Sequence, residues 1–370
     1  MAKYKLGEIC EIVSGSTPKT GIAEYWDGNL KWITPAEIDD ESYIITDSAR
    51  KLTKLGVKKT GLSSFPSGTV ILSSRAPIGK VAIAGCEMYC NQGFKNLICS
   101  DRINNRYLYW FLKGNTAYLN SLGRGATFKE ISKKIVSDIE INVPEISQQL
   151  AAVDALERVS EIIRLRKNQL QKLDELIKAR FVELFGDPLT NPKGYQEKYL
   201  SEIAEYWNGL TYKPDDVANE GTIVLRSSNI QNASLDFADT VRVNCKIGTK
   251  KYVQDNDILM CSRNGSAKLV GKVALIKELS EPMSFGAFMM IIRSAYYPFL
   301  MTYFQLPAFR SQITTGATTT INQITGRMLD NVKLAIPDIE SAKDFSAFTN
   351  QVDKSKVAVQ KSLDEAQLLF

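Results

Sequence analysis

Apolar residues recur at seven-residue intervals along one uninterrupted stretch of the chain. Residues 148–185 contain no proline or glycine, and leucine or isoleucine occupies every seventh position from Leu156 to Leu184. Such a heptad pattern predicts one long amphipathic helix with an apolar stripe. Ser147 is suited to cap its start, and Gly186 followed by Pro188 is suited to end it.

A second stretch of the same kind closes the sequence. Residues 341–370 also lack proline and glycine, and their large apolar residues keep roughly helical spacing. Because a lone amphipathic helix exposes its stripe to water, we expect the two helices to pack antiparallel. The expected contact positions, called the helix seam below, are Val153, Leu156, Ile163, Leu170, Leu173, Ile177, Phe181, Leu184, Phe345, Val352, Val359 and Leu363. The pattern leaves a second interpretation open, in which the first helix belongs to the core of one domain.

Outside these stretches the pattern is mostly that of short strands. Runs such as TVILSS and KVAIAG in the first half, and DILMCS and GKVALI in the second, are bounded by glycine, proline, asparagine and aspartate. Such runs are typical of β-strands separated by turns, with room for a few short helices.

The two halves repeat each other. SSRAPIGKVAIAG at 73–85 is echoed by SRNGSAKLVGKVAL at 262–275, and KLGEICEIVSGST at 5–17 by YLSEIAEYWNGLT at 199–211. A repeat of this length is a whole domain plus its connection to the next. The sequence therefore predicts an α+β protein with two similar, mixed, β-rich domains, joined by two long helices packed as an antiparallel coiled coil. The predicted division is 1–146 and 187–339 for the domains, and 147–186 and 340–370 for the helices.

Composition and charge add limits to this picture. With 370 residues, of which 44% are hydrophobic, the chain can bury a core in each half. Residues 1–143 carry 19 Lys and Arg against 14 Asp and Glu, and residues 190–336 carry 16 against 13. The positive excess thus lies in the two repeated parts, which points to a polyanionic ligand there.

The chain contains no histidine, which excludes Ser-His-Asp and Cys-His catalysis and any histidine-ligated metal site. Its six cysteines form no CxxC pair, so we expect buried, reduced thiols, with a zinc site as the alternative. The first residues, MAKYKLGEI, form no apolar signal region, which favours a cytoplasmic location.

Several motifs occur in duplicate. They are the L-x-E-I-x-E-x-x-x-G-x-T opening of each half, the Ser-Arg and Gly-Lys-Val-Ala strand pair, and the G-A-T turn before a V/I-P-x-I helix entry. NQGF at 91–94 and RFVELFGDP at 180–188 add to them. With these motifs the chain resembles, over essentially its whole length, the specificity subunits of type I restriction-modification systems.

The resemblance implies a non-catalytic subunit with two target-recognition domains, each reading one half of a split double-stranded DNA sequence. It also implies that two DNA-methyltransferase subunits dock on the paired helices and that restriction subunits with ATP-driven translocase and nuclease activity join them. S-adenosylmethionine and ATP with magnesium would then belong to those partners, and no cofactor to this chain. The second half departs from the first in having SFGAF at 284–288 in place of NQGF, which predicts divergent base reading.

DNA contacts can be assigned by residue type, because phosphates are bound by Lys and Arg and base edges by Arg, Lys, Asn, Gln and small hydroxyls. In the first half the expected DNA-binding residues are Ser16, Thr17, Lys19, Arg75, Lys80, Gln92, Lys95, Arg124, Thr127 and Lys129. In the second half they are Thr211, Tyr212, Lys213, Arg226, Asn229, Arg263, Asn264, Lys268, Lys272, Thr318, Asn322 and Gln323. The alternative for Arg75 and Arg263 is a structural salt bridge.

Two domains on a rigid rod act as a ruler. A helix over 148–185 is about 57 Å long, or roughly one and a half turns of DNA. We therefore expect a bipartite target with a fixed gap. The alternative function is a stand-alone or paralogous bipartite DNA-binding protein without its own methyltransferase; apolar residues outside the helix seam, such as Ile162, Leu165 and Leu176, favour partner docking.

Overall fold

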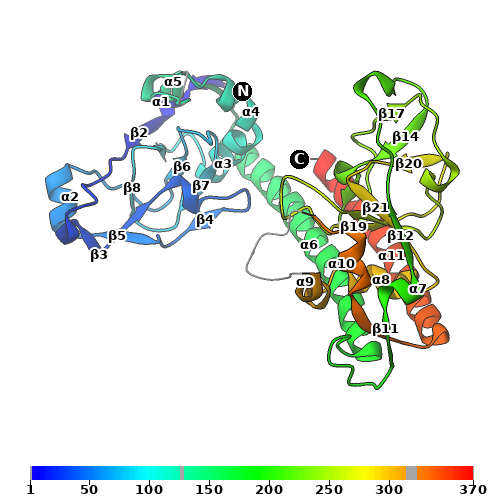
Figure 1. Cartoon of the computed structure of the whole chain (residues 1–370). Helices are drawn as coiled ribbons and strands as arrows, with labels where there is room; N and C mark the ends of the chain where they lie inside the picture. The colour runs from blue at the N-terminus through cyan, green and yellow to red at the C-terminus, as the bar shows by residue number, and fades with distance from the viewer. Residues whose placement is uncertain (1, 126–128, 314–322, 370) are drawn as a thin grey trace. The chain divides into compact units, whose positions relative to one another are not determined.

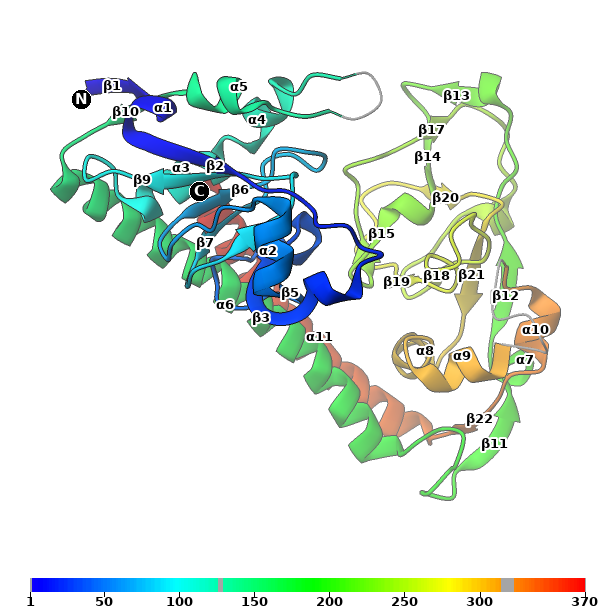
Figure 2. The ribbon, with the colours of Figure 1, turned by 90° about the vertical axis from the view of Figure 1, so that its left-hand side faces the viewer.

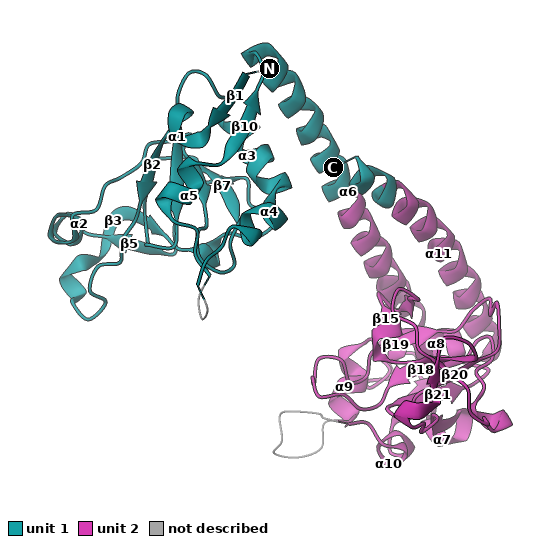
Figure 3. Cartoon of the chain, turned by 90° about the horizontal axis from the view of Figure 1, so that it is seen from above, with its two compact units in different colours: residues 1–165, 363–370 teal, residues 166–362 magenta. Residues whose placement is uncertain are grey.

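The computed structural model describes residues 2–125, 129–313 and 323–369. The chain divides into two compact units, the first containing residues 1–165 and 363–370 and the second containing residues 166–362 (Figure 3). The boundaries between the units fall within the two long helices, so each unit consists of a globular part and portions of both helices.

The described residues of the first unit form three sheets. Its first and last strands, β1 (Ala2–Lys5) and β10 (Glu140–Val143), pair antiparallel and lie side by side in Figure 2. The main sheet contains, in spatial order, β2 (Cys10–Ser14), β9 (Lys95–Cys99), β6 (Val70–Leu72), β7 (Val81–Ala84) and β4 (Ile44–Ile45). The third sheet contains β5 (Arg50–Leu52), β3 (Trp26–Ile33) and β8 (Tyr89–Cys90), of which β3 and β8 run parallel.

Short helices cover these sheets (Figure 1). They are α1 (Leu6–Ile9), α2 (Lys54–Thr60), α3 (Asn105–Gly114), α4 (Thr116–Ser121) and α5 (Lys133–Ser137). The side chain of Asn104 caps α3 by accepting from the main-chain N–H groups of Arg106 and Tyr107. Leu108 and Leu112 then lie one turn apart and are buried with residues of β6 and β7 in the main core.

The second unit has a corresponding set of strands. β11 (Gln196–Tyr199) pairs with β22 (Lys333–Ile336). The main sheet contains β12 (Glu205–Asn208), β21 (Met289–Arg293), β18 (Ile258–Cys261) and β19 (Val273–Leu275). Another sheet contains β13 (Val217–Ala218), β17 (Arg242–Val243), β14 (Thr222–Leu225) and β20 (Met283–Phe285), and β15 (Ile230–Gln231) pairs with β16 (Ser234–Leu235). Its short helices are α7 (Leu200–Ile203), α8 (Tyr297–Tyr303), α9 (Pro307–Ile313) and α10 (Gly326–Asp330).

The strand orders confirm the internal duplication. The order β2-β9-β6-β7 of the first unit recurs as β12-β21-β18-β19 in the second, and β5-β3-β8 recurs as β17-β14-β20. The parallel pair β3 and β8 also has a parallel counterpart in β14 and β20. Each sequence repeat therefore builds the same α+β arrangement.

The predicted long helices are present as α6 (Ile146–Phe185) and α11 (Ile339–Leu368). Inside the second unit they run antiparallel, because residues increasing along α6 meet residues decreasing along α11. Arg166 Nε donates to Ser362 Oγ at 3.2 Å, Asp174 and Lys356 form an ion pair, and the rings of Phe181 and Phe345 lie 5.7 Å apart.

The predicted helix seam is wrong in part, because some of its residues pack against a globular core and not against the other helix. Val153 is 1% exposed in the main core of the first unit, and Leu156 packs against the same core. At that end the stripe faces the globular part instead.

At the other end of α6, Phe181 and Phe345 contact each other but also lie in the core of the second unit, against which Ile177 and Leu184 pack. The remaining seam positions on α6, Ile163, Leu170 and Leu173, are half-buried. Those on α11, Val352, Val359 and Leu363, are 6%, 8% and 6% exposed.

Candidate nucleic-acid interface

Segments far apart in the sequence of the first unit meet beyond the ends of its strands. The main-chain N–H of Ser16 donates to Cys90 O at 3.1 Å, that of Ser74 to Gly93 O at 2.7 Å, and that of Ile131 to Ser74 O at 2.9 Å. We call residues 14–19, 73–80, 91–94, 124–125 and 129–130 the converging loops of the first unit. They contain all of the DNA-binding residues predicted there except Lys95, the first residue of β9, and Thr127, which lies outside the described residues.

The second unit brings the corresponding segments together through the same kind of bonds. Leu210 N donates to Phe285 O at 2.6 Å, Ser262 N to Phe288 O at 2.9 Å, and Ile324 N to Ser262 O at 2.7 Å. We call residues 208–213, 262–272, 286–288 and 323–324 the converging loops of the second unit.

Two pairs of glycines explain why the loops can approach so closely. A Cβ atom on Gly15 would lie 2.0 Å from Cys90 O, and one on Gly209 would lie 2.1 Å from Phe285 O. Gly79 and Gly271 have φ angles of 91° and 79°, a region that residues with a side chain avoid. The glycines of the repeated G-x-T and G-K-V-A motifs therefore serve the main-chain geometry.

A charge cluster occupies the converging loops of the first unit. Glu130 accepts a hydrogen bond from Arg75 Nε at 2.9 Å and lies 3.4 Å from Lys95 Nζ. Burial raises the pKa of the Glu130 carboxyl, but the hydrogen bond from Arg75 and the charge of Lys95 outweigh it, so the pKa lies below its usual value. Arg75, still 45% exposed, thus has the structural salt bridge that was its alternative role.

Lys95 is not kept as a predicted DNA contact. It is 7% exposed, and its ammonium group is surrounded by Ser74 Oγ, Phe94 O and Glu130. An enclosed, paired ammonium group has no free donor for a phosphate or a base.

The other predicted residues of the first unit line the rim of these loops. The hydroxyl of Thr17 donates to Gln92 Oε1, and Lys80 Nζ donates to Pro35 O at 3.0 Å. Thr17, Lys19, Gln92, Arg124 and Lys129 are exposed, and Ser16 and Lys80 are half-buried.

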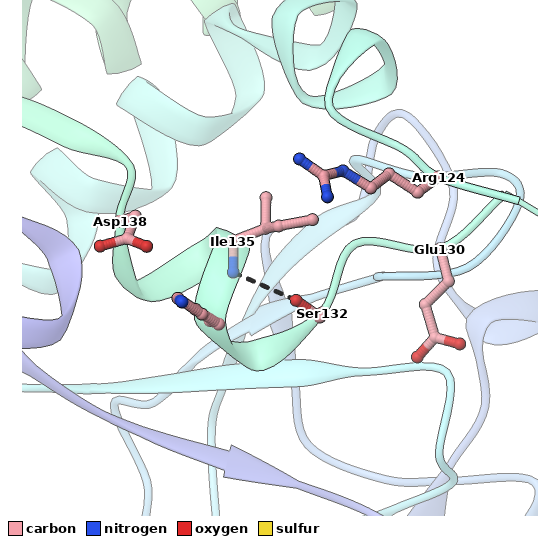
Figure 4. Close-up of a pocket in the computed structure, with 6 residues that line it drawn as sticks. Arg124, Glu130, Ser132, Ile135 and Asp138 are labelled. Atoms are coloured by element: carbon pink, nitrogen blue, oxygen red, sulfur yellow. Dashed lines mark hydrogen bonds between the residues drawn. The ribbon is translucent and has the colours of Figure 1, made fainter.

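A shallow depression of about 430 Å³ lies beside Arg124 and Glu130, bounded also by Ser132, Lys134, Ile135 and Asp138. Figure 4 shows the Arg124 side chain reaching across it toward Ile135, with Asp138 at the opposite end. Its open, mixed-charge lining favours a surface contact over a pocket that encloses a small molecule.

Two further kinds of feature, a metal site and a membrane-spanning helix, are not found among the described residues. Within them, no group of three or more Cys, Asp or Glu side chains is placed to hold a metal ion. None of the helices in the described ranges is both long and apolar enough to cross a bilayer.

Comparison with protein families matches residues 1–175 and 192–366 to the type I restriction modification DNA specificity domain. The chain belongs to this family. The MjaIX specificity subunit of Methanocaldococcus jannaschii is 36% identical over 223 residues, which cover 55% of this chain and 52% of that protein, about half its length. The MjaVIII specificity subunit of the same organism is 21% identical over 94% of this chain and 85% of its own.

The chain is also similar to a solved structure from work on the structural basis of complex assembly and conformational transition of the type I R-M system. The alignment covers 100% of this chain and 95% of that chain, with a TM-score of 0.61 and 19% identity. At that identity the likeness shows the shared fold. The chain is therefore a member of the type I specificity-subunit family.

In this specificity subunit, Asn229 is also not accessible for the predicted contact with DNA. It is fully buried, its Oδ1 accepts from Arg226 N, and its Nδ2 donates to the carbonyl groups of Asp236 and Asp239. At the corresponding turn of the first unit, the Glu37 carboxylate accepts from Thr34 N in the same way. The side chain of Asn229 therefore closes a turn. Arg226 is 2.8 Å from Asp239 and 35% exposed.

The other predicted residues of the second unit remain accessible. Thr211, Lys213, Arg263, Lys268 and Gln323 are exposed, and Tyr212, Asn264 and Lys272 are half-buried. Thr318 and Asn322 lie outside the described residues.

The sequence prediction missed Phe288, which is 60% exposed in these converging loops, with the Arg263 guanidinium 5.5 Å from its ring centre. The signal was present in SFGAF, but aligning it with NQGF by sequence pairs Phe288 with Phe94. The strand registers instead pair Phe288 with Gly93.

Proposed function

We propose that this specificity subunit recognises a bipartite double-stranded DNA target, one half through the converging loops of each unit. The observation that carries the proposal is that both units hold their loops by matching main-chain hydrogen bonds and present exposed basic side chains on them, such as Lys19, Lys129, Arg263 and Lys268. Exposed cations bind phosphates, and neighbouring amides and hydroxyls read base edges.

The target itself is found by sequencing methylated adenines in cells that carry this gene with its neighbouring methyltransferase gene. We expect a split motif with a fixed number of unread base pairs. Binding of the assembled complex to that duplex should weaken steeply with salt, because phosphate contacts release counterions. A methylated motif without a gap contradicts the proposal.

We further propose that residues 147–186 and 340–370 act as the spacer between the recognition domains 1–146 and 187–339. The support is the continuity of α6 over 40 residues and its bonds to α11 within the second unit. One heptad inserted into each helix, at the level of Arg166 and Ser362, should lengthen the gap by about 10 Å, or roughly three base pairs. Methylome sequencing measures the gap, and an unchanged gap argues against a spacer.

Two methyltransferase subunits are the proposed partners of the helices, with restriction subunits joining that complex. Ile162, Leu165 and Leu176 support this, because they are 44%, 49% and 47% exposed although they are apolar. Under this proposal S-adenosylmethionine and ATP with magnesium are held by the partners, and the complex works in the cytoplasm.

The alternative, a bipartite DNA-binding protein without its own methyltransferase, makes a different prediction. With docking, Leu176→Glu abolishes co-purification with the methyltransferase subunit while Lys172→Glu, an exposed polar control on the same helix, does not. If the wild-type chain binds the split target but never co-purifies with the methyltransferase, the alternative holds.

A further inference from the structure

The Phe288 ring lies in solvent although its main chain is held firmly. The carbonyl oxygen of Phe288 accepts three hydrogen bonds, from Ser262 N at 2.9 Å, Arg263 N at 3.0 Å and Ser262 Oγ at 2.9 Å. The preceding carbonyl, of Ala287, accepts from Asn208 Nδ2 at 3.2 Å. Because this main chain is already held, a ligand that covers the 60% exposed ring has only the side chain left to order.

A free cation accompanies the ring. The guanidinium of Arg263 lies 5.5 Å from the ring centre, and over the described ranges no carboxylate lies within ion-pair distance of it. Lys213 and Lys268, on the same converging loops, are also exposed. This surface therefore joins an apolar face to unpaired positive charge, which matches the edge of a base beside a phosphate chain.

The first unit has no such feature at the corresponding place. There Ser74 N donates to Gly93 O, as Ser262 N does to Phe288 O, so glycine replaces the aromatic residue. A Cβ on Gly93 would lie 3.1 Å from Pro35, which covers the position. Arg75, the counterpart of Arg263, is paired with Glu130.

We infer that Phe288 and Arg263 determine specificity in the second half-site, where the ring packs on the C5 methyl group of a thymine and the guanidinium donates to the O6 and N7 atoms of a neighbouring guanine. Phenylalanine against the thymine methyl and arginine against guanine are favoured major-groove pairings. The inference rests on the proposed function and deepens it by naming the bases that this surface reads.

The test uses the complex of the full chain with its methyltransferase subunits and duplexes carrying the methylated motif. Each thymine of the target is replaced singly by deoxyuridine, which removes only the methyl group, and affinity is measured by fluorescence anisotropy. One replacement, in the second half-site, should weaken binding by the wild-type complex about four-fold, the value of one buried methyl group. Phe288→Ala should bind the unmodified duplex about ten-fold more weakly and be indifferent to that replacement.

Tyr199→Ala, which truncates a 47% exposed aromatic residue on β11 away from the converging loops, is the matched control and should behave as wild type. A wild-type complex insensitive to every deoxyuridine in the second half-site overturns the thymine contact, even if Phe288→Ala weakens binding. Wild-type affinity in Phe288→Ala overturns the role of the ring while leaving the proposed function intact. Loss of sequence-specific binding by the wild-type complex itself overturns both.

Discussion

The converging loops of the two units follow the same main-chain path. They differ in the side chains at three corresponding positions that lie close together in the first unit. In the first unit Arg75, Lys95 and Glu130 form an ion cluster. At the corresponding positions of the second unit, Arg263 faces Gln323 across a β-bridge, and the place of Lys95 on the strand is taken by Met290, 1% exposed in the core.

The difference shows where this fold stores its variation. The glycines and the main-chain hydrogen bonds set the loop path in both units, so they are constrained by geometry. The side chains on that path differ between the units. In the first they form paired charges, and in the second a buried methionine, an arginine and a neutral glutamine take their places. Chemistry can therefore change at these positions while the fold stays the same.

The most disruptive test transplants a buried lysine. Met290→Lys places an ammonium group at a 1% exposed site in the core of the second unit, and we expect it to destabilise that unit by about 3–5 kcal/mol. Hydrogen-exchange mass spectrometry of the full chain should show lost protection in β18 and β21. Adding Gln323→Glu rebuilds the cluster of the first unit and should recover part of the loss, whereas Met290→Leu should cost little. No recovery would mean that the two sites are less alike than their strand registers indicate.

A smaller effect tests the shared main chain. Gly15→Ala and Gly209→Ala each push a Cβ onto a carbonyl oxygen, so each should destabilise its own unit by about 2–3 kcal/mol. Gly21→Ala and Gly248→Ala, which meet no atom within 4 Å, serve as controls. Exchange protection reports each unit separately, and a marked difference between the two main variants would break the equivalence.

The ion cluster itself should contribute less. Glu130→Gln removes the charge shared by Arg75 and Lys95 and should cost the first unit about 1–2 kcal/mol. Because the pKa of Glu130 is lowered in the folded state, its contribution is present above the carboxyl's unfolded pKa and is lost as pH falls through the folded value. The variant should therefore reduce the loss of stability on acidification, and an unchanged pH profile would contradict the cluster's role.

The smallest effect concerns how the helices are fastened. In the first unit Glu157 of α6 accepts from the hydroxyl of Tyr43 and lies 3.4 Å from Arg106, whereas in the second Asp174 of α6 pairs with Lys356 of α11. Asp174 is 55% exposed, so Asp174→Asn should cost only about 0.5 kcal/mol by thermal unfolding, and less at high salt. A loss of several kcal/mol would show that the helix pair depends on charge more than on its buried phenylalanines.

The duplication and the long helices could be predicted because each leaves a periodic signal in the sequence. The helix seam was harder, since a heptad stripe looks the same whether it faces another helix, as where Phe181 meets Phe345, or a globular core, as at Val153.

Residue type alone also misjudged part of the interface. Lys95 and Asn229 are polar and lie in the predicted segments, yet a carboxylate and three main-chain groups use their hydrogen bonds internally. Phe288 was missed because a one-residue shift in the register of the second repeat is visible only once the strands are paired.

The pairing of β1 with β10, and of β11 with β22, has an evolutionary consequence. Because each globular part is closed by its own first and last strands, the chain enters and leaves it at one place. Recombination that exchanges the gene segment from β1 to β10, or from β11 to β22, would replace one globular part as a whole. Its hydrophobic core would not be divided. Under the proposed function, new specificities would arise by such shuffling, with the other half of the split motif left untouched.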